Sequence, residues 1–168
     1  PAATSTPDAS AGVQVAIAQA TAPQDWLYLS DDEVAAAIGT ATTPEAQDRL
    51  TNGAVSELHA ARDALAGAPG AVWWLVRPLA WRATPIVGDS MSVSVWTVSI
   101  LAARDLASPQ TTFRTTTIDL TRAQGRWLVA DLTSNVGPTP DLGPGALPDD
   151  SRTFDRALDG YTRIGDAG

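Results

Sequence analysis

His59 is the only histidine of the chain, and imidazole is the side chain best suited to proton transfer near neutral pH. Catalysis or metal binding at one histidine needs partners, such as a serine, a carboxylate or further ligands. The chain has no cysteine, which excludes thiolate metal sites, thiol nucleophiles and disulfides. Asp63 follows His59 by one helical turn, so a hydrogen bond between them accounts for both residues. We expect His59 to be structural.

Three consecutive acidic residues, Asp31 to Glu33, could bind a divalent cation or act as an acid and a base. The alternation of Asp or Asn around a central glycine that marks calcium loops is absent. Ser30 precedes Glu33 by three residues, which is the pattern of a capping box at a helix start. Acidic side chains are favourable in the first turn of a helix. We therefore expect this cluster to cap a helix.

Asp119 and Asp131 fall on two successive predicted strands and are the best candidates for a general base. An inward carboxylate in a cone-shaped α+β fold can act as an isomerase-type base. Neither tyrosine of the chain falls on these strands, so no phenolic donor accompanies the pair. Three arginines are expected nearby: Arg114, Arg122 and Arg126. Cross-strand ion pairs are therefore the preferred interpretation, and no catalytic residue is assigned.

The tryptophans carry the main prediction about an interaction surface. Trp73 and Trp74 are adjacent, so on a strand one points inward and the other outward. Trp81 and Trp96 are expected to pair across the first two strands. Buried aromatic side chains belong to a core, whereas an exposed tryptophan marks a binding surface. The candidate interaction surface comprises Trp73, Trp74, Trp81 and Trp96.

The composition narrows the class of protein. The chain has 168 residues, of which 44% are hydrophobic, and a net charge of -8. This negative charge argues against direct binding to nucleic acid or to anionic lipid. The sequence lacks a Gly-rich phosphate loop and a nucleophile elbow, and we expect no cofactor and no metal. No apolar run approaches the ~20 residues that span a membrane.

The elements that position these residues are predicted from periodicity and punctuation. Apolar positions at helical spacing predict three helices, over 8–20, 30–39 and 44–65, with a weak point at Asn52–Gly53 in the third. Alternating patterns predict four strands, over 71–86, 91–101, 111–121 and 126–134. Pro78 predicts a bulge or a sheet edge in the first strand. Gly125 predicts a tight hairpin between the last two strands.

The second strand changes phase along its length. Its first apolar residues, Met91 to Val95, share one face, whereas Trp96, Val98 and Ile100 share the other. A bulge or a change of the buried face produces such a pattern, and either implies curvature. The fold class is therefore α+β, with N-terminal helices packed on a strongly curved four-stranded antiparallel meander and a short C-terminal helix.

The chain is predicted to form one domain over 1–140, in which 1–10 is a flexible lead. Residues 141–168 form a Gly/Pro-rich tail with a short helix that starts at Ser151. The chain begins at Pro1 and continues with polar residues, which suggests that an anchor or signal segment precedes it in the full-length protein.

Four segments carry a resemblance to a known family: Ser92–Val98, Thr115–Leu120, Gly125–Trp127 and Gly137–Pro140. Their pattern, VWTV, TTTxDL, GxW and GPTP, resembles actinobacterial extracytoplasmic domains of the nuclear transport factor 2-like (cystatin-like) shape. Those domains resemble the bitopic assembly subunit of type IV secretion and conjugation systems. The shared positions are packing positions, so the resemblance transfers no functional residue.

The resemblance implies a non-enzymatic, extracytoplasmic scaffold that is anchored to the cell envelope through a segment outside this chain. Its partners would be further copies of itself and other secretion or conjugation subunits. An exposed apolar patch is expected on the first strand or the first helix. The alternative is a small-molecule-binding protein or an isomerase- or cyclase-type enzyme that uses the cone cavity. A third possibility is a lipid-associated accessory domain with an uncharged apolar cavity.

Overall fold

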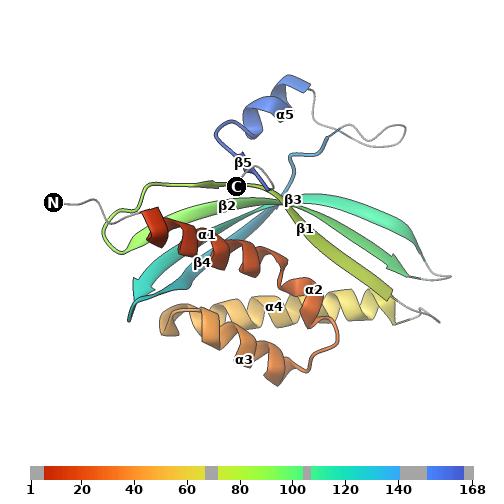
Figure 1. Ribbon diagram of the computed structural model, residues 1–168. Coiled ribbons are helices and arrows are strands. Elements are labelled where there is room, and N and C mark those ends of the chain that lie inside the picture. The colour runs from red at the N-terminus through yellow and green to blue at the C-terminus, as the bar shows by residue number, and fades with distance from the viewer. Residues whose placement is uncertain (1–5, 67–71, 104–106, 141–150, 165–168) are drawn as a thin grey trace.

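A computed structural model describes residues 6–66, 72–103, 107–140 and 151–164 of the chain. Four helices come first in the sequence, four long strands follow, and a short helix and a short strand end the described part (Figure 1). The helices are α1 (Thr6–Thr21), α2 (Pro23–Trp26), α3 (Asp31–Ala41), α4 (Pro44–Leu65) and α5 (Ser151–Ala157). The strands are β1 (Val72–Ala83), β2 (Ser90–Ala103), β3 (Ala107–Ala123), β4 (Arg126–Val136) and β5 (Thr162–Arg163).

The architecture is α+β, as predicted, but the sheet has five strands instead of four. Its order is β4-β3-β2-β1-β5, and every pairing within it is antiparallel. The extra strand, β5, pairs with β1 through Arg163 opposite Ala80 and Thr162 opposite Trp81. A pair of two residues has too little periodicity to be read from a sequence. The expected short C-terminal helix is present as α5.

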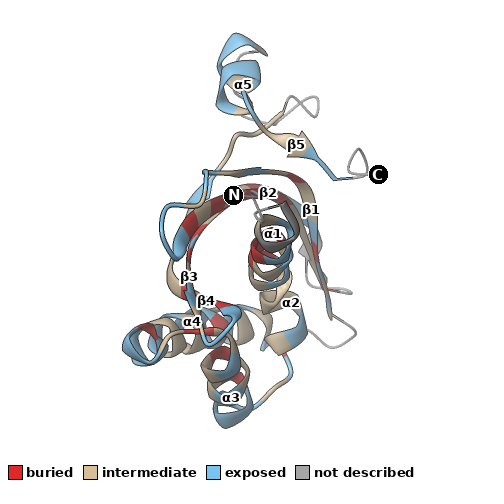
Figure 2. Cartoon of the chain, turned by 60° about the vertical axis from the view of Figure 1, so that its left-hand side comes forward, coloured by how far each residue is buried: buried red, intermediate tan, exposed pale blue. Residues whose placement is uncertain are grey.

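The first four helices lie on the concave, inner face of the sheet, and α5 lies beyond its convex, outer face (Figures 1 and 2). The sheet bends around α1, whose residues Val13 and Ala16 are buried against it (Figure 2). At Gly12 the helix comes so close that an added Cβ would lie 2.4 Å from Met91 Sδ. Only glycine permits this approach without displacing the Met91 side chain.

The core on the inner face is made by alternate residues of the strands. Buried there are Met91, Val93, Val95, Ile118, Leu120, Trp127 and Val129. A second cluster lies between α3 and α4, where Val34, Ile38 and Leu58 are buried against each other. The alternation of buried residues along β2, from Met91 to Val95, is the one that the sequence pattern indicates.

The curvature of the sheet has identifiable sources. The register of β1 against β2 shifts between Pro78 and Ala80, which confirms the bulge expected at this proline. β2 pairs with β3 without a register shift between Val95 and Trp96, so its inner row continues with the buried Thr97 while Val98 and Ile100 lie on the outer face. The hairpin after β3 is confirmed as well, with Gly125 at φ 77°.

Two features of the helices differ from the sequence prediction: α2 is an additional short helix, and one expected weak point is absent. The helix α4 continues through Asn52 and Gly53, so the expected weak point is not a break. Thr43 makes no side-chain cap; instead its backbone N–H donates to the Val129 carbonyl at 2.9 Å. The capping box of α3 is confirmed, since Glu33 and Ser30 bond to each other's backbone N–H groups.

Candidate interaction surface on the outer face of the sheet

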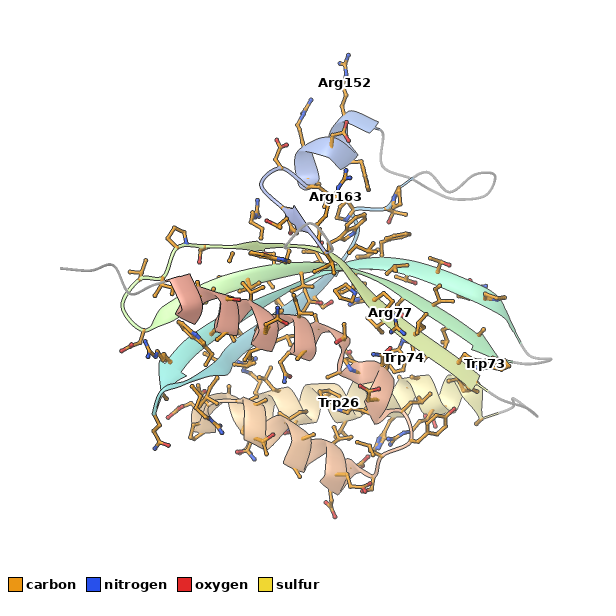
Figure 3. The ribbon with its side chains drawn as sticks, in the orientation of Figure 1. Trp26, Trp73, Trp74, Arg77, Arg152 and Arg163 are labelled. Carbon is orange, nitrogen blue, oxygen red and sulfur yellow. The ribbon has the colours of Figure 1, made fainter. Side chains whose placement is uncertain are left out.

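The four candidate tryptophans lie in three different environments. Trp73 is 54% exposed on the outer face, whereas Trp74 points toward the helices and donates its indole N–H to Ser99 Oγ at 2.9 Å (Figure 3). The prediction that adjacent tryptophans point in opposite directions is confirmed. Trp81 packs against the inner core and Trp96 against the outer face, so the expected pairing of these two is wrong. The bulge at Pro78 puts Ala80, not Trp81, opposite Trp96.

Trp73 has apolar neighbours on the same face. Leu75 follows it by two residues, is 38% exposed, and lies directly opposite Ile100 of β2. Val98, two residues before Ile100, is partly exposed on the same face. We call this set the outer patch: Trp73, Leu75, Val98 and Ile100. The sequence predicted that one of Trp73 and Trp74 faces outward, but not which one.

The free edge of β1 beside the outer patch is protected. Tyr28 donates its hydroxyl to the Val72 carbonyl at 3.3 Å. The Gln24 side-chain oxygen accepts the Val76 N–H at 2.9 Å and a guanidinium N–H of Arg77 at 3.2 Å. Side chains of α2 and the residues after it therefore occupy backbone groups that would otherwise pair with another strand. An approaching partner meets the apolar face of β1 and not an open ladder.

The inner face becomes polar beyond Val95. Thr97 and Thr116 are buried there, and Thr116 exchanges a 3.1 Å hydrogen bond with Ser134. The Nε of Arg114 donates to the same Ser134 hydroxyl at 3.0 Å. Among the described residues, no side chain or carbonyl accepts from the terminal amino groups of Arg114. Threonines on a strand are ordinary β formers, so this row has no functional signal in the sequence.

The two candidate carboxylates do not form a buried acid on the inner face. Asp119 and Asp131 lie opposite each other on β3 and β4, as expected. Asp119 alternates with the buried Ile118 and Leu120, so its exposed side chain lies on the outer side. Asp131 forms an ion pair with Arg49 of α4 at 2.9 Å, and both side chains are about half exposed. The expected ion pairing of Asp131 with a strand arginine is therefore replaced by one with a helix.

His59 has a structural partner, but not the one predicted. Its Nε2 lies 2.9 Å from Asp31 Oδ2 on α3, whereas the prediction named Asp63 on its own helix. Arg62 also bonds to Asp31, at 3.2 Å. The hydrogen bond from His59, followed by that from Arg62, lowers the pKa of Asp31. In addition, the Ser30 backbone N–H lowers the pKa of Glu33.

Arg62 ties three segments together. Its guanidinium donates to the carbonyls of Trp26, Leu27 and Leu29 as well as to Asp31. Carbonyls at the end of a helix have no partner within it, so a cation from α4 satisfies those that follow α2. The cluster around Asp31 therefore joins α2, α3 and α4, which agrees with the structural role expected for its acidic residues.

Neither a metal site nor a membrane span is found in the part of the chain that the structure describes. Over these residues, no three His, Asp or Glu side chains gather as metal ligands would. None of the described helices combines the length and the apolar character needed to cross a membrane.

The C-terminal arm, residues 151–164, covers part of the outer face. Phe154 contacts Trp96 edge-on at 5.6 Å between ring centroids, and Trp96 in turn stacks on Phe113 at 5.6 Å. The Trp96 indole N–H donates to the Pro138 carbonyl at 3.0 Å. The sequence predicted the short helix that carries Phe154 but not the partner of this residue, which lies far away in the chain.

Comparison with known proteins leaves the chain without a match: no family model, no curated protein and no solved structure is similar to it. The function of the chain is therefore inferred from the geometry of the described residues and from the resemblance of its four sequence segments to the nuclear transport factor 2-like domains.

Proposed function

We propose that this chain is a non-enzymatic assembly domain that binds other proteins through the outer patch. The observation that carries the proposal is the exposure of Trp73 next to Leu75 on a regular strand. Large apolar side chains that are exposed side by side favour protein binding, and tryptophan is enriched at the centres of interfaces. The protected edge of β1 favours docking on the face over strand addition.

A second copy of the chain is the first partner to consider. Arg77 and Thr111, which lie opposite Val98 and Ile100 in the sheet, are not acidic, although the whole chain carries a net charge of -8. Two copies can therefore meet there with less repulsion than elsewhere on the surface. A specific contact needs about 800 Å² from each partner, which is more than four side chains supply. The interface must therefore extend beyond the outer patch.

The wider assignment follows from the resemblance. The proposed fold is a nuclear transport factor 2-like (cystatin-like) cone, and the proposed context is an extracytoplasmic scaffold of a conjugation or type IV secretion-like apparatus. Anchoring to the cell envelope would come from a segment outside this chain. Helices on the concave face of a curved antiparallel sheet support this assignment. Neighbouring genes for conjugation-type ATPases would support it further, whereas isolated biosynthetic neighbours would contradict it.

The direct test is the concentration dependence of the molecular mass. Sedimentation velocity of the wild type is expected to show self-association that the double variant Trp73→Ser/Leu75→Ser abolishes. The matched control is Val136→Ser, because Val136 is 71% exposed and lies away from the outer patch. If the wild type stays monomeric, the same three proteins are tested for binding to the purified products of neighbouring genes. If both variants bind as well as the wild type, or if the wild type binds nothing, the proposal that the outer patch binds proteins is refuted.

A second candidate function is small-molecule binding in the cone, and Arg114 is the observation that favours it. Its Nε is bonded to Ser134 in the polar inner row and its terminal amino groups have no described acceptor, so an anionic group could bind there. Neither Asp119 nor Asp131 joins this row, and the candidate is therefore a binding function without an assigned base. Replacing Arg114 with Gln should abolish such binding while leaving self-association unchanged.

A further inference from the structure

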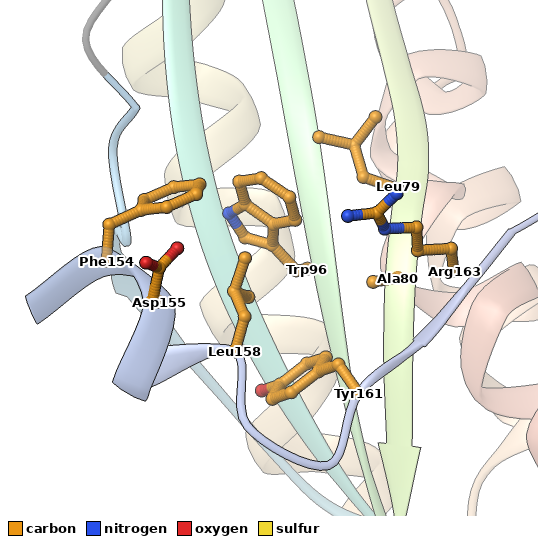
Figure 4. A pocket seen from close by; sticks show the side chains of 8 residues that line it. All are labelled: Leu79, Ala80, Trp96, Phe154, Asp155, Leu158, Tyr161 and Arg163. Carbon is orange, nitrogen blue, oxygen red and sulfur yellow. The ribbon is translucent and has the colours of Figure 1, made fainter. Parts of the chain in front are cut away.

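A hollow lies between the outer face of the sheet and the C-terminal arm. Its volume is about 560 Å³, within the range of small-molecule pockets. Leu79 and Trp96 form its floor on the sheet side, and Phe154, Leu158 and Tyr161 come from the arm (Figure 4). With Ala80, six apolar or aromatic side chains therefore surround one space on the face opposite the helices.

Two opposite charges border this hollow. Asp155 of α5 and Arg163 of β5 both line it, and in the view of Figure 4 they lie on opposite sides of Trp96. Neither forms an ion pair with another charged side chain in the described ranges. An apolar space with a carboxylate on one side and a guanidinium on the other is complementary to a molecule with both charges.

Two other groups beside the hollow already have partners. The Trp96 indole N–H is bonded to the Pro138 carbonyl, so it is not available to a ligand. Arg82 lies over the Tyr161 ring at 5.0 Å and donates to the Asp159 carbonyl at 3.3 Å. Arg163 and Asp155 are therefore the charged groups that can accept a new partner here.

We propose that this hollow binds a small apolar zwitterion, of the class of free aromatic dipeptides. The ligand's carboxylate would pair with Arg163, its ammonium with Asp155, and its rings would pack beside the Trp96–Phe154 pair, against Leu79, Leu158 and Tyr161. The volume of about 560 Å³ suits a free small molecule. The site is separate from the outer patch and does not depend on the assembly function.

The test uses phenylalanyl-phenylalanine as the probe, together with its N-acetyl and C-amide derivatives. Isothermal titration calorimetry is run to about 10 mM, because weak small-molecule sites have Kd values near 1 mM. The free dipeptide is expected to bind, and each capped derivative to bind about two- to fivefold more weakly, as expected for solvent-exposed charge pairs. NMR should show a shift of the Trp96 indole N–H, assigned with Trp96→Phe, and none for the buried Trp127.

Charge-neutral variants test which residue binds each charged group of the dipeptide. Arg163→Gln should weaken binding of the free dipeptide but not of the C-amide, and Asp155→Asn should weaken the free dipeptide but not the N-acetyl form. Arg156→Gln and Asp48→Asn are matched controls, since both residues are exposed and neither lines the hollow. No binding to the wild type would overturn the proposal. So would equal binding of the three probes, or losses that do not follow the matched residue.

Discussion

Trp73 and Trp74 are neighbours in the chain, yet one is 54% exposed on the outer face and the other donates its indole N–H to Ser99 Oγ at 2.9 Å on the inner face. The same substitution at the two positions should therefore have different effects. Trp74→Ala removes a partly buried side chain that packs against the helix cluster, and we expect it to lower the free energy of unfolding by about 2 kcal/mol. Trp73→Ala should change it by less than about 0.5 kcal/mol. Urea denaturation followed by circular dichroism measures both, and a larger loss for Trp73→Ala would contradict the assignment of faces.

The interaction of Asp31 with His59 predicts a dependence of stability on pH. The pKa of Asp31 is lowered in the folded protein, so its stabilising contribution is present above the unfolded value near 3.9 and is lost as the pH falls through the folded value. The difference in unfolding free energy between the wild type and Asp31→Asn should therefore shrink as the pH falls from about 5 to 3. Thermal or urea unfolding across this range measures the difference. Asp32→Asn is the matched control, since Asp32 forms no ion pair in the described ranges. A difference that grows toward low pH would refute the prediction.

Arg62 connects α4 to the carbonyls that follow α2. Arg62→Ala leaves these partly buried carbonyls without a donor, and we expect a loss of about 1–3 kcal/mol in unfolding free energy. Arg49→Ala is a useful comparison, because the Arg49–Asp131 ion pair is about half exposed and should contribute at most about 1 kcal/mol. Chemical denaturation measures the free energy of unfolding of both variants. An equal loss in the two would show that the carbonyl contacts of Arg62 do not stabilise the protein.

The hairpin between β3 and β4 gives a test of backbone conformation. Gly125 has φ 77°, and no atom lies within 4 Å of the position that a Cβ would occupy. Gly125→Ala therefore introduces conformational strain without a clash, and we expect a loss of about 1 kcal/mol. Gly53→Ala on α4 also meets open space but has helical geometry, so it should stabilise the protein by a similar amount. Opposite signs in a denaturation experiment are the expected result.

Much of the fold could be predicted from local patterns. The capping box at Ser30, the bulge at Pro78 and the hairpin at Gly125 each depend on residues that are close in sequence. Such signals have a local physical cause, which is why they hold without knowledge of the tertiary structure. Helices followed by an alternating meander then leave few arrangements other than α+β.

The wrongly predicted side-chain partners are residues that lie far apart in the chain. His59 pairs with Asp31 rather than Asp63, because α3 and α4 pack side by side and bring an acidic helix start against the imidazole. Trp96 meets Phe154 rather than Trp81, because a bulge of one residue changes the face of every residue on one side of it. Spacing along one helix or strand carries no information about such contacts.

The contact between Phe154 and Trp96 gives the last prediction. It is one attachment of the C-terminal arm, which also pairs with β1 through two residues and contacts Arg82 through Tyr161 and Asp159. Phe154→Ala should weaken the arm locally and leave the core intact, because the inner face does not depend on this contact. Hydrogen exchange is the suitable measurement, since the Ile164 N–H donates to the Leu79 carbonyl only while the arm is in place. This amide should exchange about tenfold faster in the variant if the aromatic pair contributes about 1.4 kcal/mol, while amides of β2 and β3 keep their protection. Unchanged exchange at Ile164 would mean that β5 holds the arm without Phe154.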